Sequence, residues 1–534
     1  MKHPHRGAGA SAPRVSSTGR GRPLLAALLI AVTGCNDSSK PAASQPTLTV
    51  FCAAGLKKPV EAIAAKYRED FGVEVQLQYG GTGTLLSQIR IAQRGDLFLS
   101  ADDAGIADAR KSDSIREVIP CVRQRPVIAV RAGNPKKIAT FADLARDDVK
   151  LALANPEAAA IGRSVRAALA EKYEPLAKHA TVQKPTVTEI AADLSLGAVD
   201  AAILWDSTVP QFKDIEAVEA AELSGITENA NAAVLTACQD SVAALRFARY
   251  LAAPEKGSAI FQQQGFKPIG GDKWAEKPEM ILYSGGVNRP AVEQILRDFS
   301  DREGVTVTTV FNGCGILCAT MKTMGDATNP KFPDAYYACD LCFVPPVAQN
   351  FPEAQILTET EIGIVVKKGN PQGVKTLAGL AQPGLRVGLC NVQQSTLGYM
   401  TQGMLRDLGI ADVVRKNVVV EVPTADFLVN QMRAGALDAA IVYRVNAALQ
   451  SEHLDFIQID HAGAKAVQPF SIRAGSPNRQ LAGRLLAFMK LNRASFEKAG
   501  FTWRGNEPAI RSDKIEVPPW LRPGAVTGPN GTGR

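Results

Sequence analysis

An internal repeat constrains the fold of this chain more than any other feature. Residues 51–61 read FCAAGLKKPVE, and residues 283–293 read YSGGVNRPAVE, a shift of 232 positions (283 minus 51). Further matches follow in one order, and the shift drifts by only a few residues. The matching positions are Gly72/Gly304, Val73/Val305, Gly81/Gly313, Gly83/Gly315, Asp96/Asp334, Asp102/Asp340, residues 133–135/369–371, Asn155/Asn391, Gly162/Gly398 and residues 200–203/438–441. So many ordered matches indicate two copies of one folding unit.

The repeat also predicts the domain boundaries. We expect module one at residues 47–271, a linker at 272–279, module two at 280–508 and a Pro/Gly-rich tail at 509–534. A chain of 534 residues has room for three to four folding units of about 150 residues. Each module is therefore expected to hold more than one compact part.

Within each module, short β-branched runs alternate with helical periodicity, which predicts an α/β fold. Residues 47–51 and 73–79 indicate strands, and a glycine turn at 80–84 precedes a helix that carries Leu85, Leu86 and Ile89. A helix follows the first strand in each module. Its apolar stripes at i, i+3, i+4 and i+7 are Val60, Ile63, Ala64 and Tyr67 in module one and Val292, Ile295, Leu296 and Phe299 in module two.

The amino terminus is expected to be an export signal. Arginines at 14, 20 and 22 precede an apolar run at 24–32, about half the ~20 residues that a membrane-spanning helix needs. The run ends at Val32-Thr33-Gly34-Cys35, which resembles the lipobox of bacterial lipoproteins. The resemblance implies that residues 1–35 are a signal whose Cys35 receives lipid, and residues 36–46 then form a flexible tether. We expect an exported, periplasmic, membrane-anchored protein.

The charge distribution excludes one class of partner. The net charge is +7 over 534 residues, and no basic run with interleaved aromatic residues occurs, so nucleic acid is not expected. Small anions remain possible, because the start of a helix carries unpaired N–H groups and a partial positive charge. Glycine turns precede helices at residues 54–56, at 81–83 and between 155 and 162. If these helix starts converge, neutral donors surround one anion.

Several motifs of module one resemble those of molybdate-binding periplasmic proteins of ABC importers. They are VFCAAGL at 50–56, YGGTG at 79–83, DLFLSAD at 96–102, ANP at 154–156 and DAAILW at 200–205. The resemblance implies tandem type II periplasmic-binding modules, each of two α/β lobes joined by hinge strands. It also implies an ABC permease as partner and an oxyanion in the cleft. The implied anion-binding residues are Gly55, Thr82, Ala154, Asn155, Val187 and Trp205.

Two positions depart from the family pattern, which usually has Ser at position 55 and Tyr at 205. Gly55 keeps its N–H but has no hydroxyl, and Trp205 donates only from its indole. Module two departs further, and six extra residues between Gly315 and Asp334 are expected beside its cleft. That module therefore binds another solute, or binds nothing and serves as a spacer or docking surface. Its equivalent residues are Val287, Cys314, Cys390, Asn391 and Tyr443.

Cysteines gather in module two, and three interpretations stay open: disulfides, a zinc or Cu(I) thiolate site, or buried free thiols. The spacings are Cys-x3-Cys and Cys-x2-Cys, and a bridge between Cys121 and Cys238 in module one is a further possibility. The five residues of the module-two group are Cys314, Cys318, Cys339, Cys342 and Cys390.

The sequence gives little support for catalysis. None of the five histidines occurs at matching positions of the two modules, and Asp102 and Asp340 are expected to be helix caps or hinge contacts. We therefore expect a solute-binding lipoprotein, not an enzyme. It would capture a molybdate-like or tungstate-like oxyanion for ABC-type import, with no required cofactor. The alternative is a metal-thiolate or redox lipoprotein that acts through the cysteines of module two.

Overall fold

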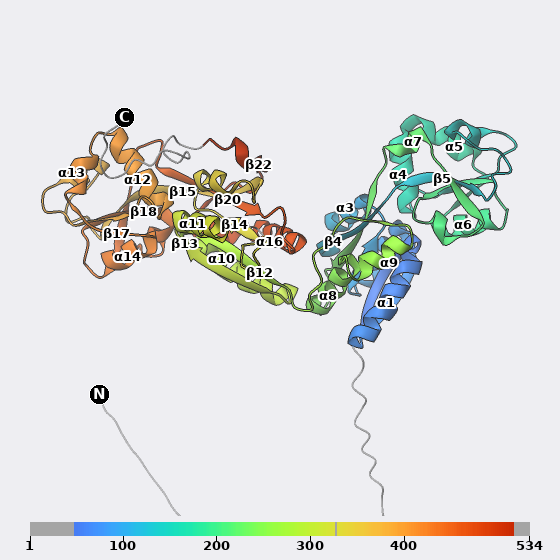
Figure 1. Ribbon diagram of the computed structural model, residues 1–534, viewed down its shortest axis with the longest axis horizontal. Helices are drawn as coiled ribbons and strands as arrows, with labels where there is room; N and C mark the ends of the chain where they lie inside the picture. The colour runs from blue at the N-terminus through green and yellow to red at the C-terminus, as the bar shows by residue number, and fades with distance from the viewer. Residues whose placement is uncertain (1–46, 326–327, 517–534) are drawn as a thin grey trace, which may run out of the picture. The chain divides into compact units, whose positions relative to one another are not determined.

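The computed structural model describes residues 47–325 and 328–516. The expected signal, Cys35, the tether and residues 517–534 of the tail lie outside these ranges. Within them, no helix combines the length and the apolar character needed to cross a membrane. Both modules are built from mixed sheets with helices packed on them, so the predicted α/β class is confirmed (Figure 1).

The first lobe of module one contains both ends of its chain. Its sheet has the strand order β11-β4-β10-β3-β1-β2, in which β1 pairs in parallel with β2 and β3. The strands are β1 (Thr47–Ala53), β2 (Glu74–Gly80), β3 (Leu97–Ser100), β4 (Ile115–Gln124), β10 (Glu228–Leu235) and β11 (Lys267–Pro268). The helices are α1 (Lys57–Phe71), α2 (Thr82–Ala92), α3 (Asp103–Lys111), α8 (Ser241–Ala252) and α9 (Gly257–Gln263), and a 3₁₀ turn, η1 (Ala54–Leu56), precedes α1.

The second lobe of module one is a separate sheet with the order β7-β6-β8-β5-β9. Figure 1 shows its helices around β5. The strands are β5 (Pro126–Arg131), β6 (Leu151–Ala154), β7 (Val182–Lys184), β8 (Ala201–Trp205) and β9 (Ile215–Val218). The helices are α4 (Ala160–Leu169), α5 (Tyr173–His179), α6 (Val187–Ser195) and α7 (Ala221–Ser224). Only Arg125 separates β4 from β5, so the chain passes directly from one lobe to the other.

Module two repeats this plan on one continuous sheet, with the order β13-β12-β14-β20-β15-β18-β16-β17. The long strand β15 (Glu353–Lys367) pairs with β20 in one lobe and with β18 in the other, and β19, β21 and β22 also pair with it. The strands are β12 (Glu279–Gly285), β13 (Thr306–Asn312), β14 (Ala335–Tyr337), β16 (Val387–Cys390), β17 (Val418–Val422), β18 (Ala439–Tyr443), β19 (Leu454–Gln458), β20 (Lys465–Ile472), β21 (Thr502–Trp503) and β22 (Ile510–Arg511).

The helices of module two follow a similar order, with several local differences. Two 3₁₀ turns, η6 (Leu341–Phe343) and η7 (Pro345–Val347), stand where module one has α3, because Pro345 and Pro346 cannot continue a helix. The helices are α10 (Arg289–Glu303), α11 (Cys314–Met324), α12 (Thr396–Asp407), α13 (Ala411–Arg415), α14 (Ala425–Arg433), α15 (Arg444–Ala448), α16 (Arg479–Leu491) and α17 (Arg493–Lys498), and the turn η5 (Gly286–Asn288) precedes α10.

Helices α1 and α10 confirm the predicted apolar stripes. All eight predicted stripe residues are buried. Both helices end at a glycine in the left-handed region, Gly72 with φ 68° and Gly304 with φ 65°. Glycine accepts this conformation without strain, which explains why it recurs at both helix ends.

The six extra residues of module two do not lie beside its cleft, as had been expected. Helices α2 and α11 have equal length, so the added residues follow the carboxyl end of α11. The cleft residues lie at the amino end of α11, next to Gly313. The insertion therefore lengthens a distant connection.

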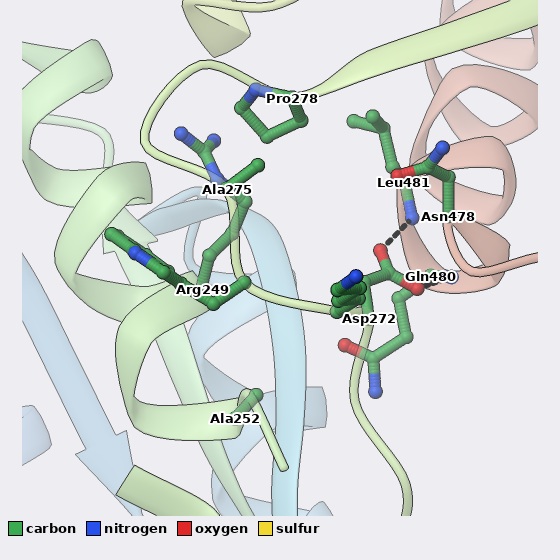
Figure 2. Close-up of a pocket in the computed structure, with 10 residues that line it drawn as sticks. Arg249, Ala252, Asp272, Ala275, Pro278, Asn478, Gln480 and Leu481 are labelled. Atoms are coloured by element: carbon green, nitrogen blue, oxygen red, sulfur yellow. Dashed lines mark hydrogen bonds between the residues drawn. The ribbon is translucent and has the colours of Figure 1, made fainter. Parts of the chain in front are cut away.

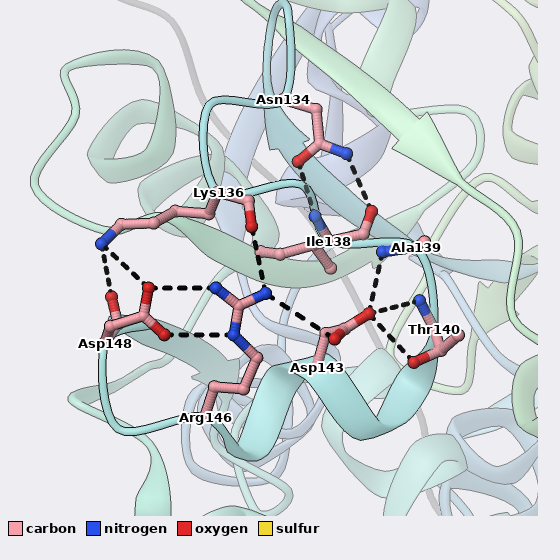
Figure 3. Close-up of polar contacts among 8 residues, drawn as sticks. All are labelled: Asn134, Lys136, Ile138, Ala139, Thr140, Asp143, Arg146 and Asp148. Atoms are coloured by element: carbon pink, nitrogen blue, oxygen red, sulfur yellow. Dashed lines mark hydrogen bonds and ion pairs between the residues drawn. The ribbon is translucent and has the colours of Figure 1, made fainter.

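A polar turn in the second lobe recurs in both modules. The Asn134 side chain accepts from the N–H of Ile138 at 2.9 Å and donates to its carbonyl at 2.8 Å (Figure 3). Asn370 makes the same two bonds with Val374 at 3.1 and 2.7 Å. Figure 3 also shows Asp143, which accepts from the backbone N–H of Thr140 at the next helical turn. These bonds stabilise the connection after the hinge strand.

Residues of the expected linker contact module two. The Asp272 carboxylate accepts from the backbone N–H groups of Gln480 and Leu481 at 2.7 and 2.8 Å, at the amino end of α16 (Figure 2). A carboxylate is favoured there because the helix start carries a partial positive charge. Nearby, buried Glu303 pairs with Arg484 at 2.7 Å and with Arg249 at 3.5 Å. The described chain therefore has fixed polar contacts at this junction.

Candidate functional site

Four helix starts of module one meet at one small cavity. Helix α1 with its preceding turn η1, together with α2, reaches the cavity from the first lobe, and α4 and α6 reach it from the second. The first N–H groups of a helix have no partner within it, so all four starts present donors and partial positive charge. The lining residues are Ala53, Ala54, Gly55, Gly80, Gly81, Thr82, Ala101, Ala159, Ala160, Ile161, Thr186, Val187 and Trp205.

The lining of this cavity is neutral. Among the described residues that form it, none carries a charged side chain. The cavity is small, with a volume of about 20 Å³. The site therefore favours small anions through N–H groups and helix dipoles, without a cationic side chain.

The residue at position 55 is glycine because its surroundings leave little room. A Cβ atom there would lie 3.1 Å from Val187 Cγ2 and 3.7 Å from Trp205 Cδ1. The side chains of Val187 and Trp205 are 5% and 1% exposed, so they are held in place by packing. A side chain at position 55 would therefore crowd Val187, whereas Trp205 stays at an ordinary contact distance.

Two buried hydroxyl groups lie beside the cavity. Thr82 is 1% exposed, and its Oγ1 accepts from the Ala101 N–H at 3.4 Å, which leaves the hydroxyl proton for another acceptor. Thr208 is fully buried, and its Oγ1 has no hydrogen-bond partner among the described residues. That oxygen would lie 3.8 Å from a Cβ at Gly55. Sequence reasoning missed Thr208, because a single threonine after a strand carries no motif.

The glycine turn at residues 80–83 does more than supply donors. The Gly83 N–H donates to the Ala158 carbonyl of the opposite lobe at 2.9 Å. A Cβ at Gly81 would overlap the carbonyl oxygens of Ala158 and Pro185. The turn therefore lets the main chains of the two lobes touch, and module one is closed. We had expected the turn mainly as an anion-binding element.

Of the six expected anion-binding residues, Gly55, Thr82, Val187 and Trp205 line the cavity, and Ala154 and Asn155 do not. The Asn155 side chain accepts from the N–H groups of Glu157 and Ala158 and so shapes the turn before α4. That turn brings Ala159 and Ala160 to the cavity. Alanines contribute only main-chain groups, so no side-chain signal marks them.

Asp102 has the structural role that was predicted. Its carboxylate accepts from the Gly105 N–H at 3.1 Å and caps α3. Burial raises the pKa of this carboxyl, and the nearby Arg163 guanidinium, 3.1 Å away, opposes that shift. Arg163 also pairs with Asp108 at 2.9 Å, so its charge is committed to carboxylates and not to the cavity. Asp340 likewise caps its turn, by accepting from the Cys342 N–H at 2.9 Å.

Module two has a corresponding cavity at the starts of α10, α11, α12 and α14. The glycine turn of module two also touches the opposite lobe. A Cβ at Gly313 would overlap the Gln394 carbonyl oxygen, and a Cβ at Gly315 would overlap that of Gln393, so this module is closed too. Of the expected equivalents, Val287 and Tyr443 line the cavity, whereas Cys314, Cys390 and Asn391 do not. The lining residues are Gly286, Val287, Gly313, Cys339, Ser395, Pro423, Thr424, Ala425, Asp426, Tyr443 and Asn446.

The five cysteines of module two do not form one cluster. Cys314 and Cys339 are in contact, with a sulfur–sulfur distance of 2.8 Å, and Cys318 donates to the Phe343 carbonyl instead. Within residues 47–325 and 328–516, no group of three or more histidine, cysteine or acidic side chains has the arrangement of a metal site. The hydrogen bond with Cys314, together with burial, raises the pKa of Cys339 well above 9.

In module one, Cys121 and Cys238 are free and have different partners. Cys121 contacts the Ile119 carbonyl, and Cys238 donates to Asp96 at 3.3 Å. The bridge between them that the sequence allowed is therefore absent from the described structure.

Comparisons with known proteins agree with the geometry. The family model described as bacterial extracellular solute-binding protein matches residues 48–267 and 281–502. The molybdate-binding protein ModA of Mycobacterium tuberculosis H37Rv is 26% identical over 258 residues, which cover 47% of this chain and 97% of that protein. The molybdate-binding protein ModA of Escherichia coli K12 is 36% identical over 77 residues, or 14% of this chain and 28% of that protein.

Among solved structures, the periplasmic molybdate-binding protein of Azotobacter vinelandii is similar. The alignment covers 41% of this chain and 98% of that protein, with 17% sequence identity and a TM-score of 0.36.

Proposed function

The chain belongs to the bacterial extracellular solute-binding protein family, and from this premise we propose that module one captures a small tetrahedral oxyanion such as molybdate or tungstate. In this proposal the closed module carries the anion to the permease of an ABC importer and performs no chemistry on it. The matched proteins of M. tuberculosis and E. coli, which are named as molybdate-binding, support this choice of solute.

One observation carries the proposal: four helix starts converge on a cavity with a neutral lining. Hydrogen bonds to a charged group contribute about 1.5–3 kcal/mol each, so several main-chain donors and the Thr82 hydroxyl suffice for tight binding. A fixed cation is unnecessary. Neutral donors also let the anion leave when the lobes separate, which a carrier requires.

The first test replaces Thr82, the buried hydroxyl of the cavity, by valine of the same shape. Thr82→Val should weaken molybdate binding by about tenfold to a hundredfold, because one hydrogen bond to the anion is lost. Isothermal titration of the full chain with molybdate, tungstate and sulfate measures this. Thr84→Val is the matched control, because Thr84 is exposed on the same helix and should leave binding unchanged. Absence of binding to every oxyanion contradicts the proposal, as does full affinity in Thr82→Val.

We also propose that the protein is exported and anchored by lipid at Cys35. The apolar run at 24–32 and the following cysteine support this. Replacement of Cys35 by serine should move the protein from the membrane fraction to the soluble fraction and abolish labelling with a radioactive fatty acid. Membrane retention of the serine variant would contradict the anchor.

A second candidate function, a redox role for module two, is favoured by the contact between Cys314 and Cys339. Two thiols can form one S–S bond by passing two electrons and two protons to an external disulfide, which is reduced to two thiols. Treatment with oxidised glutathione followed by alkylation and peptide mass analysis tests the pair. The expected product links Cys314 to Cys339 and leaves Cys318 alkylated. Alkylation of both sulfurs after oxidant excludes this role.

A further inference from the structure

The module-two cavity keeps the helix starts of module one but adds a carboxylate. Asp426 lies in the first turn of α14, at the position that Thr188 occupies in α6. It is a lining residue of the cavity, whereas the cavity of module one has no charged side chain in its described lining. The two cavities therefore present different charges to a solute.

The carboxylate of Asp426 is held in a defined place. Its Oδ1 accepts from Asn446 Nδ2 at 2.8 Å, and Asn446 is 4% exposed. Its Oδ2 would lie 3.9 Å from a Cβ at Gly286, next to the turn that precedes α10. Thus one oxygen is fixed by a buried amide, and the other faces the same helix starts that would attract an anion.

Two further buried polar atoms at this cavity lack partners within the described residues. They are the Tyr443 hydroxyl and the Asn446 Oδ1 atom, on side chains that are 3% and 4% exposed. A buried polar group without a hydrogen bond costs about 1–3 kcal/mol. Both residues line the cavity, so a bound polar solute would supply the missing partners. Tyr443 can donate or accept, and Asn446 Oδ1 can only accept.

These groups place conflicting demands on a simple anion. The starts of α10, α11, α12 and α14 favour negative charge, whereas Asp426 and Asn446 Oδ1 need a donor. Exposed Arg289 stacks on Phe311 at 4.7 Å and adds positive charge near Asp426. An oxyanion that carries its own proton suits this lining better than one without, because its bare oxygens accept from the helix starts and its one hydroxyl group donates to Asp426.

We propose that the module-two cavity binds a protonated oxyanion of the hydrogenphosphate type, and that Asp426 accepts the hydrogen bond from its hydroxyl group. A fully deprotonated oxyanion of the same shape, such as sulfate, would instead place an acceptor oxygen against the carboxylate. That contact is repulsive and leaves Asp426 without a donor. The carboxylate thus selects by the presence of a proton and not by size.

This inference concerns a different cavity and a different solute class from the proposed function of module one. The two ideas can fail separately, because each is measured at its own residues. Molybdate binding is tested through Thr82 in module one, and hydrogenphosphate binding is tested through Asp426 in module two.

The experiment compares inorganic phosphate with sulfate on the full chain at neutral pH, where phosphate keeps a proton and sulfate does not. Isothermal titration gives the affinities, and hydrogen–deuterium exchange locates the site. Phosphate should bind at least tenfold more tightly than sulfate and should protect the segments around 285–290 and 423–428. Asp426→Asn should reduce this ratio below about threefold, because an amide can both donate and accept.

Asp412→Asn is the matched control, since it removes an exposed carboxylate from the first turn of another helix of the same module. It should retain the full preference for phosphate. The proposal is overturned if sulfate binds as well as phosphate in the unmodified chain, or if phosphate protects only module one. It is also overturned if Asp426→Asn keeps the preference, or if the cavity binds only organic ammonium ions.

Discussion

The two cavities of this chain are formed by equivalent helix starts, but at one pair of positions the larger side chain comes from different lobes. In module one, Gly55 of the first lobe faces Val187 of the second. In module two the equivalent residues are Val287 and Ala425, so the large side chain has moved to the other lobe. The sum of side-chain volume stays nearly constant while its source changes. We therefore expect the missing side chain at position 55 to be one half of a compensating exchange between the lobes.

The chemistry of the cavities differs more than their packing. Thr82, Thr188 and Trp205 of module one correspond to Cys314, Asp426 and Tyr443 of module two. The helix starts and the glycine turns stay the same in both. The two cavities thus share their main-chain frame and differ in a few side chains, and under the proposals above those side chains set the solute of each module.

The largest expected difference between the modules appears when one of them is prevented from closing and molybdate affinity is measured. A Cβ at Gly83 would overlap the Glu157 carbonyl, so Gly83→Ala should reduce molybdate affinity at least about a hundredfold, or about 2.7 kcal/mol. Gly315→Ala, the counterpart in module two, should leave molybdate affinity unchanged. Isothermal titration of both variants measures the difference.

Folding itself should survive the Gly83 substitution. The residue is in the first turn of α2, where alanine is the better helix former, and each lobe keeps its own core. Thermal unfolding should therefore occur at the same temperature as in the unmodified chain. Equal loss of molybdate binding in both variants would show that the modules do not bind independently.

The exchanged packing pair gives the second prediction. Gly55→Val should cost about 1–3 kcal/mol of stability in module one, because its side chain would crowd Val187, already 3.1 Å from a Cβ at that position. The double variant Gly55→Val with Val187→Ala copies module two and should recover most of the loss. Urea denaturation gives the free energies. If the double variant is as unstable as the sum of the two single variants, the pair is not compensatory.

The smallest predicted effect concerns acid stability of the second lobes. The Arg386 guanidinium, 2.7 Å from Asp438, lowers the pKa of that carboxyl to about 2 from an ordinary value of 3.8. A lowered pKa in the folded state adds stability above the ordinary value, and this is lost as pH falls from about 4 to about 2. Asp438→Asn should remove this part of the acid sensitivity.

Arg386→Gln removes the partner of Asp438 and should reduce the acid sensitivity as Asp438→Asn does. Urea midpoints measured from about pH 6 down to about pH 2 test both variants. An unchanged pH dependence in Arg386→Gln would contradict the role given to Arg386.

The frame of the fold could be predicted from the sequence because it depends on periodic apolar residues and on glycine. The stripe through Val60, Ile63 and Tyr67 and the glycine at 72 recur in module two, and the structure has both. Local preference and burial agree at these positions, so the pattern is unambiguous.

Parts of the cavities could not be predicted, for two physical reasons. Ala159 and Ala160 line the cavity with main-chain and methyl groups, which carry no recognisable signal in the sequence. Asp426 has no acidic counterpart in module one, and an acid in the first turn of a helix usually faces solvent. Only three-dimensional proximity shows that Asn446 fixes its carboxylate at 2.8 Å.

The contact between the glycine turn and the opposite lobe has a consequence for how such proteins diversify. In each module, peptide carbonyls and N–H groups of the glycine turn contact the opposite lobe, and in module one Arg163, which lies outside the cavity, also pairs with Asp102 and Asp108 across the lobes. Substitutions in the cavity can therefore change the bound solute while the contacts between the lobes stay intact. After duplication of a gene segment, a few point mutations in the cavity suffice to change the solute of one module, and that module keeps its closed conformation.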